Sequence, residues 1–479
     1  MLNNIFYSIK KTIIKTIFFK GFVWSKRILL LLVAFWIIGC DDFVEVDAPK
    51  NLLVSETVFN DPSTVKSALA NIYYKMKEQG LLSGNRGLSP FIGCYADQLD
   101  YLDDDPNVLE LYRHTVTSSN AEIKNWWVQA YYLIYAANDI IDGLNGSNRI
   151  TEMDKNQYMG EALFIRAYLH SLLANLFGDI PYITSTSYLK NNSVAKEGMS
   201  TINNYIIEDL KDAIQLMQPR KVGSERVVPD QTTAKALLAR IYLFDKDWEL
   251  ASVLATEVIN SPNYQLEDDI SLVFLKNSSE TIWQFKPDGI NFRNTIEANF
   301  FIIGSVALQR YAINNSLIEA FEPGDLRKEQ WIGSFTNPNN GDLFYYPYKY
   351  KESLSTAESL EYSIMFRLAE QYLIRAEAEA QLNKIADSQD DLNVIRNRAN
   401  LPNTSADTKN ELLNSIIQER RVELFSELGH RWFDLKRTDK ASEILSLIKS
   451  NWKSTDILLP IPKSELELNP NLRPQNDGY

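Results

Sequence analysis

Apolar residues recur at helical spacing over most of the chain. Residues 71–79 and 125–144 carry them three and four positions apart, which is the period of an α-helix with one buried face. Residues 160–177 are apolar on nearly every side, so we expect this helix to lie between neighbours rather than on the surface. A Gly-Asp-Ile-Pro sequence at 178–181 ends it. The pattern predicts a mainly α-helical protein.

The clearest helical unit spans residues 231–260. One predicted helix covers 231–244 and a second covers 249–260, with a short polar turn between them. Small side chains stand beside bulky ones where the two helices would cross. This pattern resembles a tetratricopeptide unit, a pair of helices of about 34 residues, and it predicts a scaffold of stacked helical repeats. The small residues are Ala234, Ala236 and Ala239, and weaker echoes of the unit lie at 166–169 and 368–383.

Residues 277–351 interrupt the helical pattern. The stretch is rich in Asn, Gly, Pro and aromatic residues, and it holds short alternating runs but no long helical period. We interpret it as irregular loops and short strands inserted into the scaffold, where binding residues often lie. The last segment, 456–479, contains four prolines and cannot be helical throughout.

The first 39 residues have the composition of a signal peptide. They hold six basic residues and no acidic one, and an unbroken apolar run covers residues 28–38. That run is shorter than the roughly 18 residues that a membrane-spanning helix needs. It ends in Ile-Ile-Gly before Cys40, which resembles the lipobox of bacterial lipoproteins, whose cysteine is acylated. The alternative is a secretory signal that is followed by a cysteine by chance.

The charge balance narrows the possible partners. Removal of residues 1–39, with their six basic residues, would change the formal net charge from −13 to −19. Such an acidic chain is a poor match for nucleic acid, whose phosphates need a basic face. Asp41 and Asp42 follow the cysteine directly and resemble the surface-export signal of Bacteroidetes lipoproteins.

Motifs for catalysis are missing from the sequence. The chain contains no His-Glu-x-x-His, no Gly-x-Ser-x-Gly and no phosphate-binding Gly-Lys-Ser/Thr sequence. Two cysteines are too few for a disulfide framework, a zinc ribbon or an iron–sulfur cluster. We interpret Cys94 as a packed small apolar residue rather than a nucleophile.

Five groups of residues, spread over nearly the whole chain after residue 39, carry a more specific signal. They are 40–43; 160–167 with 177–181; 234–243; 375–380 with 392–399; and 419–424 with 429–437, 460–462 and 469–470. In this order they resemble the SusD/RagB family of nutrient-binding outer-membrane lipoproteins. Each group alone is a weak signal, but together they are specific.

The resemblance implies a scaffold of tetratricopeptide-like helix pairs with inserted irregular loops and short strands. It divides the chain into a lipoprotein signal peptide (1–39), an N-terminal region (40–225) and a C-terminal region (226–479) with an insertion at about 277–351. It also implies a lipid anchor at Cys40 in the outer membrane, facing the cell exterior, and a SusC-like TonB-dependent transporter as partner. The implied activity is capture of an oligosaccharide, or of a peptide as in RagB, without catalysis, metal or cofactor.

Charged residues cluster in two places. At 419–427, acidic and basic residues stand three and four positions apart, so we expect them to pair along one helix that Gly429 caps. Arg431 and Asp434 are expected to pair locally. We interpret this region as a buried ion-pair network in preference to a ligand site. The acidic run at 97–105 is interpreted as a solvated loop, and calcium binding is the alternative.

Aromatic residues in loops are the candidates for binding a sugar. Aromatic rings stack on the apolar faces of sugars, while fixed polar groups bind the hydroxyls. Because the chain is acidic, a neutral glycan is a better match than an anionic one. The opposing interpretation is that most of these rings pack beneath the loops. The predicted ligand-binding residues, from the loop at 86–101 and the insertion, are Tyr95, Asp97, Tyr101, Arg293, Trp331, Tyr345 and Tyr346.

Two other classes of function stay open at this point. A surface glycoside hydrolase needs two carboxylates, and a chain with 62 acidic residues always offers some pair. A purely structural tetratricopeptide adaptor would bind the transporter but no glycan or peptide. The release of reducing ends from glycans would identify the first, and the lack of any ligand would favour the second.

Overall fold

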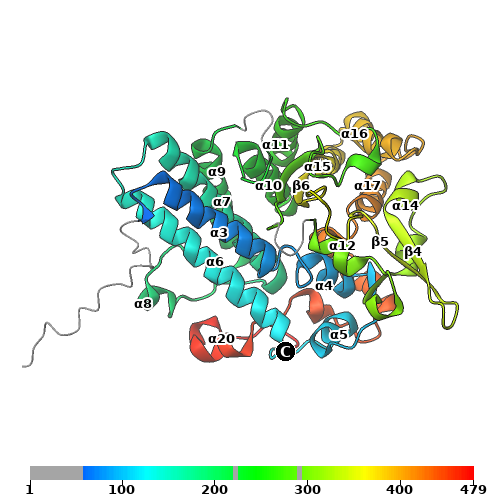
Figure 1. Cartoon of the computed structure of the whole chain (residues 1–479), viewed down its shortest axis with the longest axis horizontal. Helices are drawn as coiled ribbons and strands as arrows, with labels where there is room; N and C mark the ends of the chain where they lie inside the picture. The colour runs from blue at the N-terminus through cyan, green and yellow to red at the C-terminus, as the bar shows by residue number, and fades with distance from the viewer. Residues whose placement is uncertain (1–57, 220–224, 289–293) are drawn as a thin grey trace, which may run out of the picture. The chain divides into compact units, whose positions relative to one another are not determined.

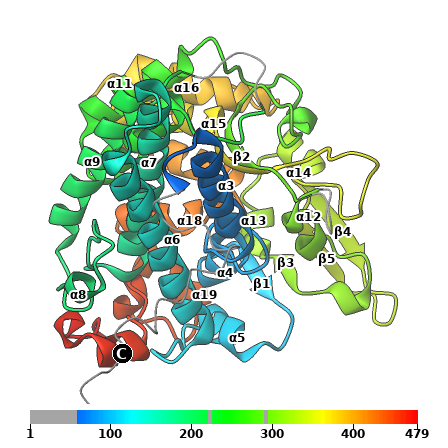
Figure 2. The same ribbon diagram turned by 60° about the vertical axis from the view of Figure 1, so that its left-hand side comes forward.

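Helices form the framework of the computed structural model, which describes residues 58–219, 225–288 and 294–479 (Figures 1 and 2). These residues fall within one compact unit, Ser55–Tyr479. The signal segment and Cys40 lie outside them, and the division near residue 225 stays a prediction. The helices of the first part are α3 (Pro62–Glu78), α4 (Leu88–Tyr95), α5 (Pro106–Arg113), α6 (Ala121–Gly146), α7 (Glu152–Phe177), α8 (Tyr188–Asn191) and α9 (Met199–Leu216).

Local sequence signals fix where these helices begin. The side chain of Asp61 accepts a hydrogen bond from the Ser63 amide at the start of α3, and Thr151 does the same for Asp154 at the start of α7. Gly178, with a φ of 78°, follows the last residue of α7, as the sequence predicts. The α7 helix begins earlier than the predicted 160–177, because its first turns are polar and lack the apolar period.

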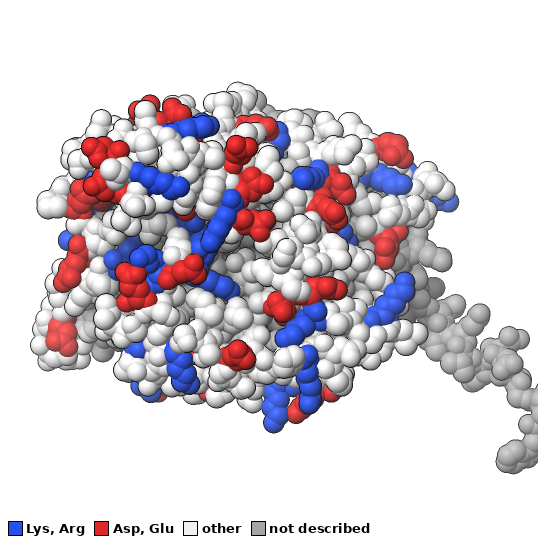
Figure 3. All heavy atoms as spheres, turned by 180° about the vertical axis from the view of Figure 1, so that it is seen from behind, with Lys and Arg blue, Asp and Glu red and all other residues white. Residues whose placement is uncertain are grey.

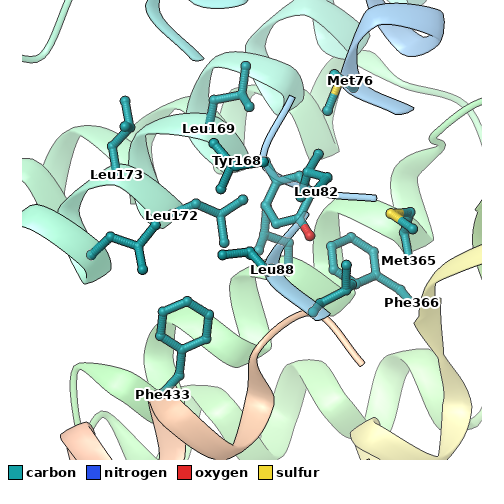
Figure 4. Packing of buried hydrophobic residues seen from close by; sticks show 14 of the residues in the cluster. Met76, Leu82, Leu88, Tyr168, Leu169, Leu172, Leu173, Met365, Phe366 and Phe433 are labelled. Carbon is teal, nitrogen blue, oxygen red and sulfur yellow. The ribbon is translucent and has the colours of Figure 1, made fainter. Parts of the chain in front are cut away.

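The middle of α7 is the centre of the core. Its residues from Gly160 to Phe177 are buried almost without interruption, and the helix packs against α6 and α9. In Figure 4, Tyr168 and Leu172 of this helix point toward Leu88, Phe366 and Phe433, which come from distant parts of the chain. The prediction of a helix enclosed by neighbours is confirmed.

A second set of helices forms the repeat scaffold. The α10 helix packs on α9 and α11, α11 packs on α15, and α15 packs on α16 and α17, so each helix pair covers the next. Ala234, Ala236 and Ala239 are fully buried within α10. The predicted scaffold is confirmed. Its helices are α10 (Gln231–Phe244), α11 (Trp248–Ile259), α15 (Leu368–Gln381), α16 (Ile385–Arg398) and α17 (Lys409–Glu423).

The segment between α11 and α15 has the irregular character that its sequence predicts. Within it, β2 pairs antiparallel with β6 and β4 with β5, while β3 pairs antiparallel with β1, which lies earlier in the chain between α4 and α5. Short helices also occur in it, namely α12 (Ile296–Phe301), α13 (Asn315–Ile318) and α14 (Leu326–Gln330). The strands are β1 (Leu99–Tyr101), β2 (Thr281–Phe285), β3 (Tyr311–Ile313), β4 (Ile332–Thr336), β5 (Leu343–Pro347) and β6 (Ser363–Arg367).

The C-terminal part consists of short helices and turns, as its prolines predict. In the described part of the chain, no helix combines the length and the hydropathy that crossing a membrane requires. Its helices are α18 (His430–Arg437), α19 (Ala441–Ile448) and α20 (Lys463–Leu468), and its 3₁₀ turns are η4 (Ser454–Ile457) and η5 (Pro470–Leu472). Two further 3₁₀ turns, η2 (Ile270–Leu272) and η3 (Val306–Leu308), lie in the segment between α11 and α15.

A buried ion-pair network joins the insertion to the repeats. Glu423 of α17 is fully buried and meets Arg367 at the end of β6 (2.6 Å), Arg327 of α14 (2.9 Å) and Arg398 of α16. Arg367 and Arg398 both contact Glu280, which precedes β2. The three guanidinium groups hold the pKa of Glu423 well below its usual value although burial alone would raise it. The predicted buried network is therefore confirmed.

The details of that prediction are wrong in two respects. The charged residues at 419–427 do not pair along one helix: Arg420 contacts Asp434 of α18, and Arg421 contacts Asp97. Gly429, with a φ of 74°, caps the start of α18, because α17 has already ended at Glu423. Local spacing could not reveal these partners, since Asp434 lies on the next helix and Asp97 lies far away in the sequence.

Candidate functional site

Two of the predicted ligand-binding aromatics belong to the core. Residues 86–101, predicted as a loop, contain α4 and β1, and Tyr95 is a fully buried residue of α4 that donates a hydrogen bond to the Asp456 carbonyl (2.7 Å). Trp331 is only 1% exposed, and its indole N–H donates to the Ile270 carbonyl (3.1 Å). The expectation that these rings are exposed is wrong. Each ring can be buried because a backbone carbonyl from a distant segment accepts the hydrogen bond of its polar group.

Asp97 and Tyr101 are also turned inward. The carboxylate of Asp97 is buried and accepts two hydrogen bonds from Arg431 (2.7 and 2.8 Å), and it also contacts Arg421 (3.0 Å). Burial would raise the pKa of Asp97, but the two guanidinium groups lower it below its ordinary value. The Tyr101 ring is buried 5.4 Å from Tyr311. The predicted local pair of Arg431 with Asp434 is also wrong. Arg431 forms its ion pair with Asp97, and Asp434 forms one with Arg420.

The acidic run at 97–105 is not one solvated loop. Asp100 accepts hydrogen bonds from Tyr112 and Asn314, and Asp105 caps α5, whereas Asp103 and Asp104 are exposed. Among the described residues, no group of three or more His, Cys, Asp or Glu side chains is placed to hold a metal ion. Most carboxylates of the run therefore serve the fold.

Cys94 is fully buried in α4 with a free thiol. Burial raises its pKa to about 12. A thiol that stays protonated is a poor nucleophile. The interpretation of Cys94 as a packed small residue is confirmed.

Tyr345 and Tyr346 lie on β5 and are half-buried, while Arg293 lies outside the described residues. In the β4–β5 hairpin, Tyr345 pairs with Ser334 and Tyr346 pairs with Gly333. Since successive side chains of a strand point to opposite faces, the two tyrosines point in opposite directions. Tyr345 packs against the core, whereas Tyr346 lies over Gly333 on the other face.

That other face of the hairpin is aromatic. Phe335 pairs with Phe344, and Tyr346 lies 5.9 Å from Tyr348, with the two rings nearly perpendicular. All four side chains are partly exposed. A side chain at Gly333 would collide with the Tyr346 ring, so this glycine lets the ring lie close to the backbone of β4. We call Phe335, Phe344, Tyr346 and Tyr348 the hairpin platform.

A polar recess of about 850 Å³ is lined by residues of α17, α18 and the turn before α11. Its arginines are already engaged within the protein: Arg431 and Arg421 contact Asp97, and Arg437 contacts Glu377. An anion entering the recess would compete with these carboxylates. The recess is therefore a weaker candidate for ligand binding than the hairpin platform.

Two family profiles match the chain. One, described as the SusD family, matches residues 329–479, and the other, described as starch-binding and associating with the outer membrane, matches residues 42–243. A similar relative is SusD-like protein P2 of Formosa agariphila, which is 26% identical over 95% of this chain and 99% of its own length.

Solved structures share the fold. A SusD superfamily protein from Bacteroides vulgatus has a TM-score of 0.78 and 23% identity, over 88% of this chain and 100% of that one. A laminarin-binding SusD-like protein has a TM-score of 0.73 and 22% identity, over 87% and 99%. The helical fold, the matched segments at both ends and the full-length relative agree, and they confirm that this chain belongs to the SusD/RagB family.

Proposed function

We propose that the protein binds a neutral oligosaccharide at the outer membrane and delivers it to a SusC-like TonB-dependent transporter, without catalysing a reaction. The hairpin platform is the observation that carries the proposal. It presents several partly exposed aromatic rings on one face, which suits the flat apolar faces of sugar rings. The starch-binding description of the matched family and the laminarin-binding neighbour support a carbohydrate as the ligand.

A neutral glycan suits the charge distribution better than an anionic one. The four rings of the hairpin platform are uncharged, a single cation among the described residues, that of Lys351, lies over the Tyr348 ring (5.7 Å), and the chain carries a formal net charge of −13. On the face that Figure 3 shows, basic and acidic side chains are interspersed and large areas carry neither. This face has no broad basic surface that could attract a sulfated or uronic-acid polymer.

The binding test uses the full-length protein in mild detergent on an array. The array carries neutral oligosaccharides of glucose, mannose, galactose and xylose beside anionic glycans and peptides. We expect binding to neutral glycans. Replacing both Tyr346 and Tyr348 by alanine should weaken it roughly tenfold, because each ring contact contributes about 0.5–1.5 kcal/mol.

The control for this experiment is Tyr74→Ala, which removes an exposed tyrosine from α3. Binding of peptides alone would favour the RagB-like alternative. Release of reducing ends from a bound glycan would contradict the proposal and identify a hydrolase.

We also propose that Cys40 carries the lipid anchor. Cys40→Ala should abolish labelling with a fatty-acid analogue and move the protein out of the membrane fraction, because two or more acyl chains are needed for stable anchoring. Cys94→Ala is the matched control, since it removes the only other cysteine and should leave labelling unchanged. Retention of label and membrane association in Cys40→Ala would place the anchor elsewhere.

The transporter partner rests on family membership and on the proposed anchor. Mild detergent extraction from the native membrane should recover the protein together with a TonB-dependent barrel. Mass spectrometry of the purified complex identifies the partner. Recovery of the free protein alone, while another lipoprotein–barrel pair from the same cells stays intact, would contradict this part of the proposal.

A further inference from the structure

A groove lies where α6, the segment around α8 and the C-terminal helix α20 meet. Its volume is about 620 Å³, which is within the usual range for ligand sites. The α8 and α20 elements are far apart in the sequence but lie beside each other in Figures 1 and 2. Neither β4 nor β5 contributes to the lining, so this groove is separate from the hairpin platform.

One wall of the groove is an aromatic stripe on α6. Trp127, Tyr131 and Tyr135 follow one another at intervals of four residues, which puts them on the same face of the helix. Trp127 and Tyr131 are 5.0 Å apart, and the Tyr131 hydroxyl donates a hydrogen bond to the Pro181 carbonyl (2.9 Å). Phe177 contacts Trp127 edge-on from behind (5.1 Å). These two rings are fixed before any ligand arrives.

Other aromatic surface in the groove is open to solvent. Tyr135 is 47% exposed and Tyr188, from α8, is 75% exposed. Among the described residues, no hydrogen bond uses the hydroxyl of either tyrosine or the side-chain amide of Asn192, which also lines the groove. The groove thus combines ring faces with polar groups that form no hydrogen bond to the described part of the chain.

The charge of the groove restricts what it can bind. Glu465 of α20 lines the groove. Burial raises the pKa of Tyr131, and the negative charge of Glu465 raises it further. None of the described lining residues is Lys or Arg. An anionic ligand would meet repulsion from Glu465. An acyl chain would bury the carboxylate and the amide without hydrogen bonds, which costs free energy.

We propose that this groove is a second carbohydrate site, separate from the hairpin platform, that takes a neutral oligosaccharide. The inference rests on the proposed glycan-binding function and adds the place where a further part of a glycan chain binds. Tyr135 and Tyr188, the exposed rings, stack on sugar rings, while the buried Trp127 and the half-buried Tyr131 support Tyr135 from the same helix face. The carboxylate of Glu465, the side-chain amide of Asn192 and the hydroxyl groups of the two exposed tyrosines hydrogen-bond to sugar hydroxyls.

The test compares four full-length proteins: the parent, the groove variant Tyr135→Ala/Tyr188→Ala, the platform variant Tyr346→Ala/Tyr348→Ala, and Tyr132→Ala. Tyr132 is a matched control because it lies on α6, is 46% exposed and does not line the groove. The probe is the neutral array oligosaccharide that binds the parent most tightly, titrated by calorimetry. Both groove tyrosines are exposed, so melting curves of the groove variant should match the parent.

We expect the groove variant to bind the probe roughly tenfold more weakly than the parent, or to lose one of two binding events, while Tyr132→Ala is unchanged. Parent-like affinity and stoichiometry in the groove variant would overturn the inference and leave the proposed function intact. A parent that binds no neutral glycan would overturn the proposed function itself, and the groove inference with it. Loss of binding in the groove variant alone would keep the groove and reject the platform.

Discussion

Replacing Glu423 by alanine should destabilise the protein by about 3–5 kcal/mol, because it would leave Arg327, Arg367 and Arg398 in the interior without their shared carboxylate. This is a large part of the ~5–15 kcal/mol by which a typical domain is stable. Urea unfolding, followed by circular dichroism, measures the change in free energy.

Two comparisons separate charge from other effects. Glu423→Gln keeps the size of the side chain and should recover only part of the loss. Glu257→Ala breaks the exposed pair with Lys235 (2.8 Å) and should cost no more than about 1 kcal/mol. Equal effects of the Glu257 and Glu423 variants would contradict the importance of the buried network.

The pH dependence of this contribution has a definite sign. The folded protein lowers the pKa of Glu423, so the contribution is complete above the ordinary glutamate pKa of about 4.3. It is lost as the pH falls toward the folded value. The difference in stability between parent and Glu423→Gln should therefore shrink in acid.

Trp331→Ala should also destabilise the fold, by about 3–5 kcal/mol. The ring packs edge-on against Phe274 (5.4 Å), and the amino group of the buried Lys349 lies 4.8 Å from its centre. Its hydrogen bond to the Ile270 carbonyl would be lost as well. Chemical denaturation measures the loss, and Tyr346→Ala, at a half-buried surface position, serves as the control with a smaller effect. An unchanged stability combined with weaker glycan binding would instead show that Trp331 contacts the ligand.

The sequence predicts the helical scaffold well because helix period and repeat spacing are local properties. The 231–244 helix has the same bounds as α10, and small residues mark the crossing of helices. The positions of side chains in the irregular segments are not local properties. Tyr95 can be buried because its hydroxyl donates a hydrogen bond to the Asp456 carbonyl, and Asp97 because its carboxylate accepts hydrogen bonds from Arg431. Neither partner can be inferred from sequence spacing.

The groove illustrates a signal that was present in the sequence. Trp127, Tyr131 and Tyr135 share one helical face, but the same spacing describes an ordinary buried stripe. Only the structure shows that Tyr135 is exposed and that Tyr188 and Glu465 line the same groove. An aromatic stripe on a long helix predicts a binding surface only when no neighbouring helix covers it.

The position of the ion-pair network has a consequence for how the protein unfolds. In simple repeat proteins each unit contacts only its neighbours, so stability is close to a sum of local terms and the ends can open first. Here Glu423 links α14, β6 and α16, which belong to the insertion and to different repeat helices. Opening one repeat would expose charges that hold the others. We therefore expect the repeats and the insertion to unfold as one cooperative unit rather than stepwise from an end.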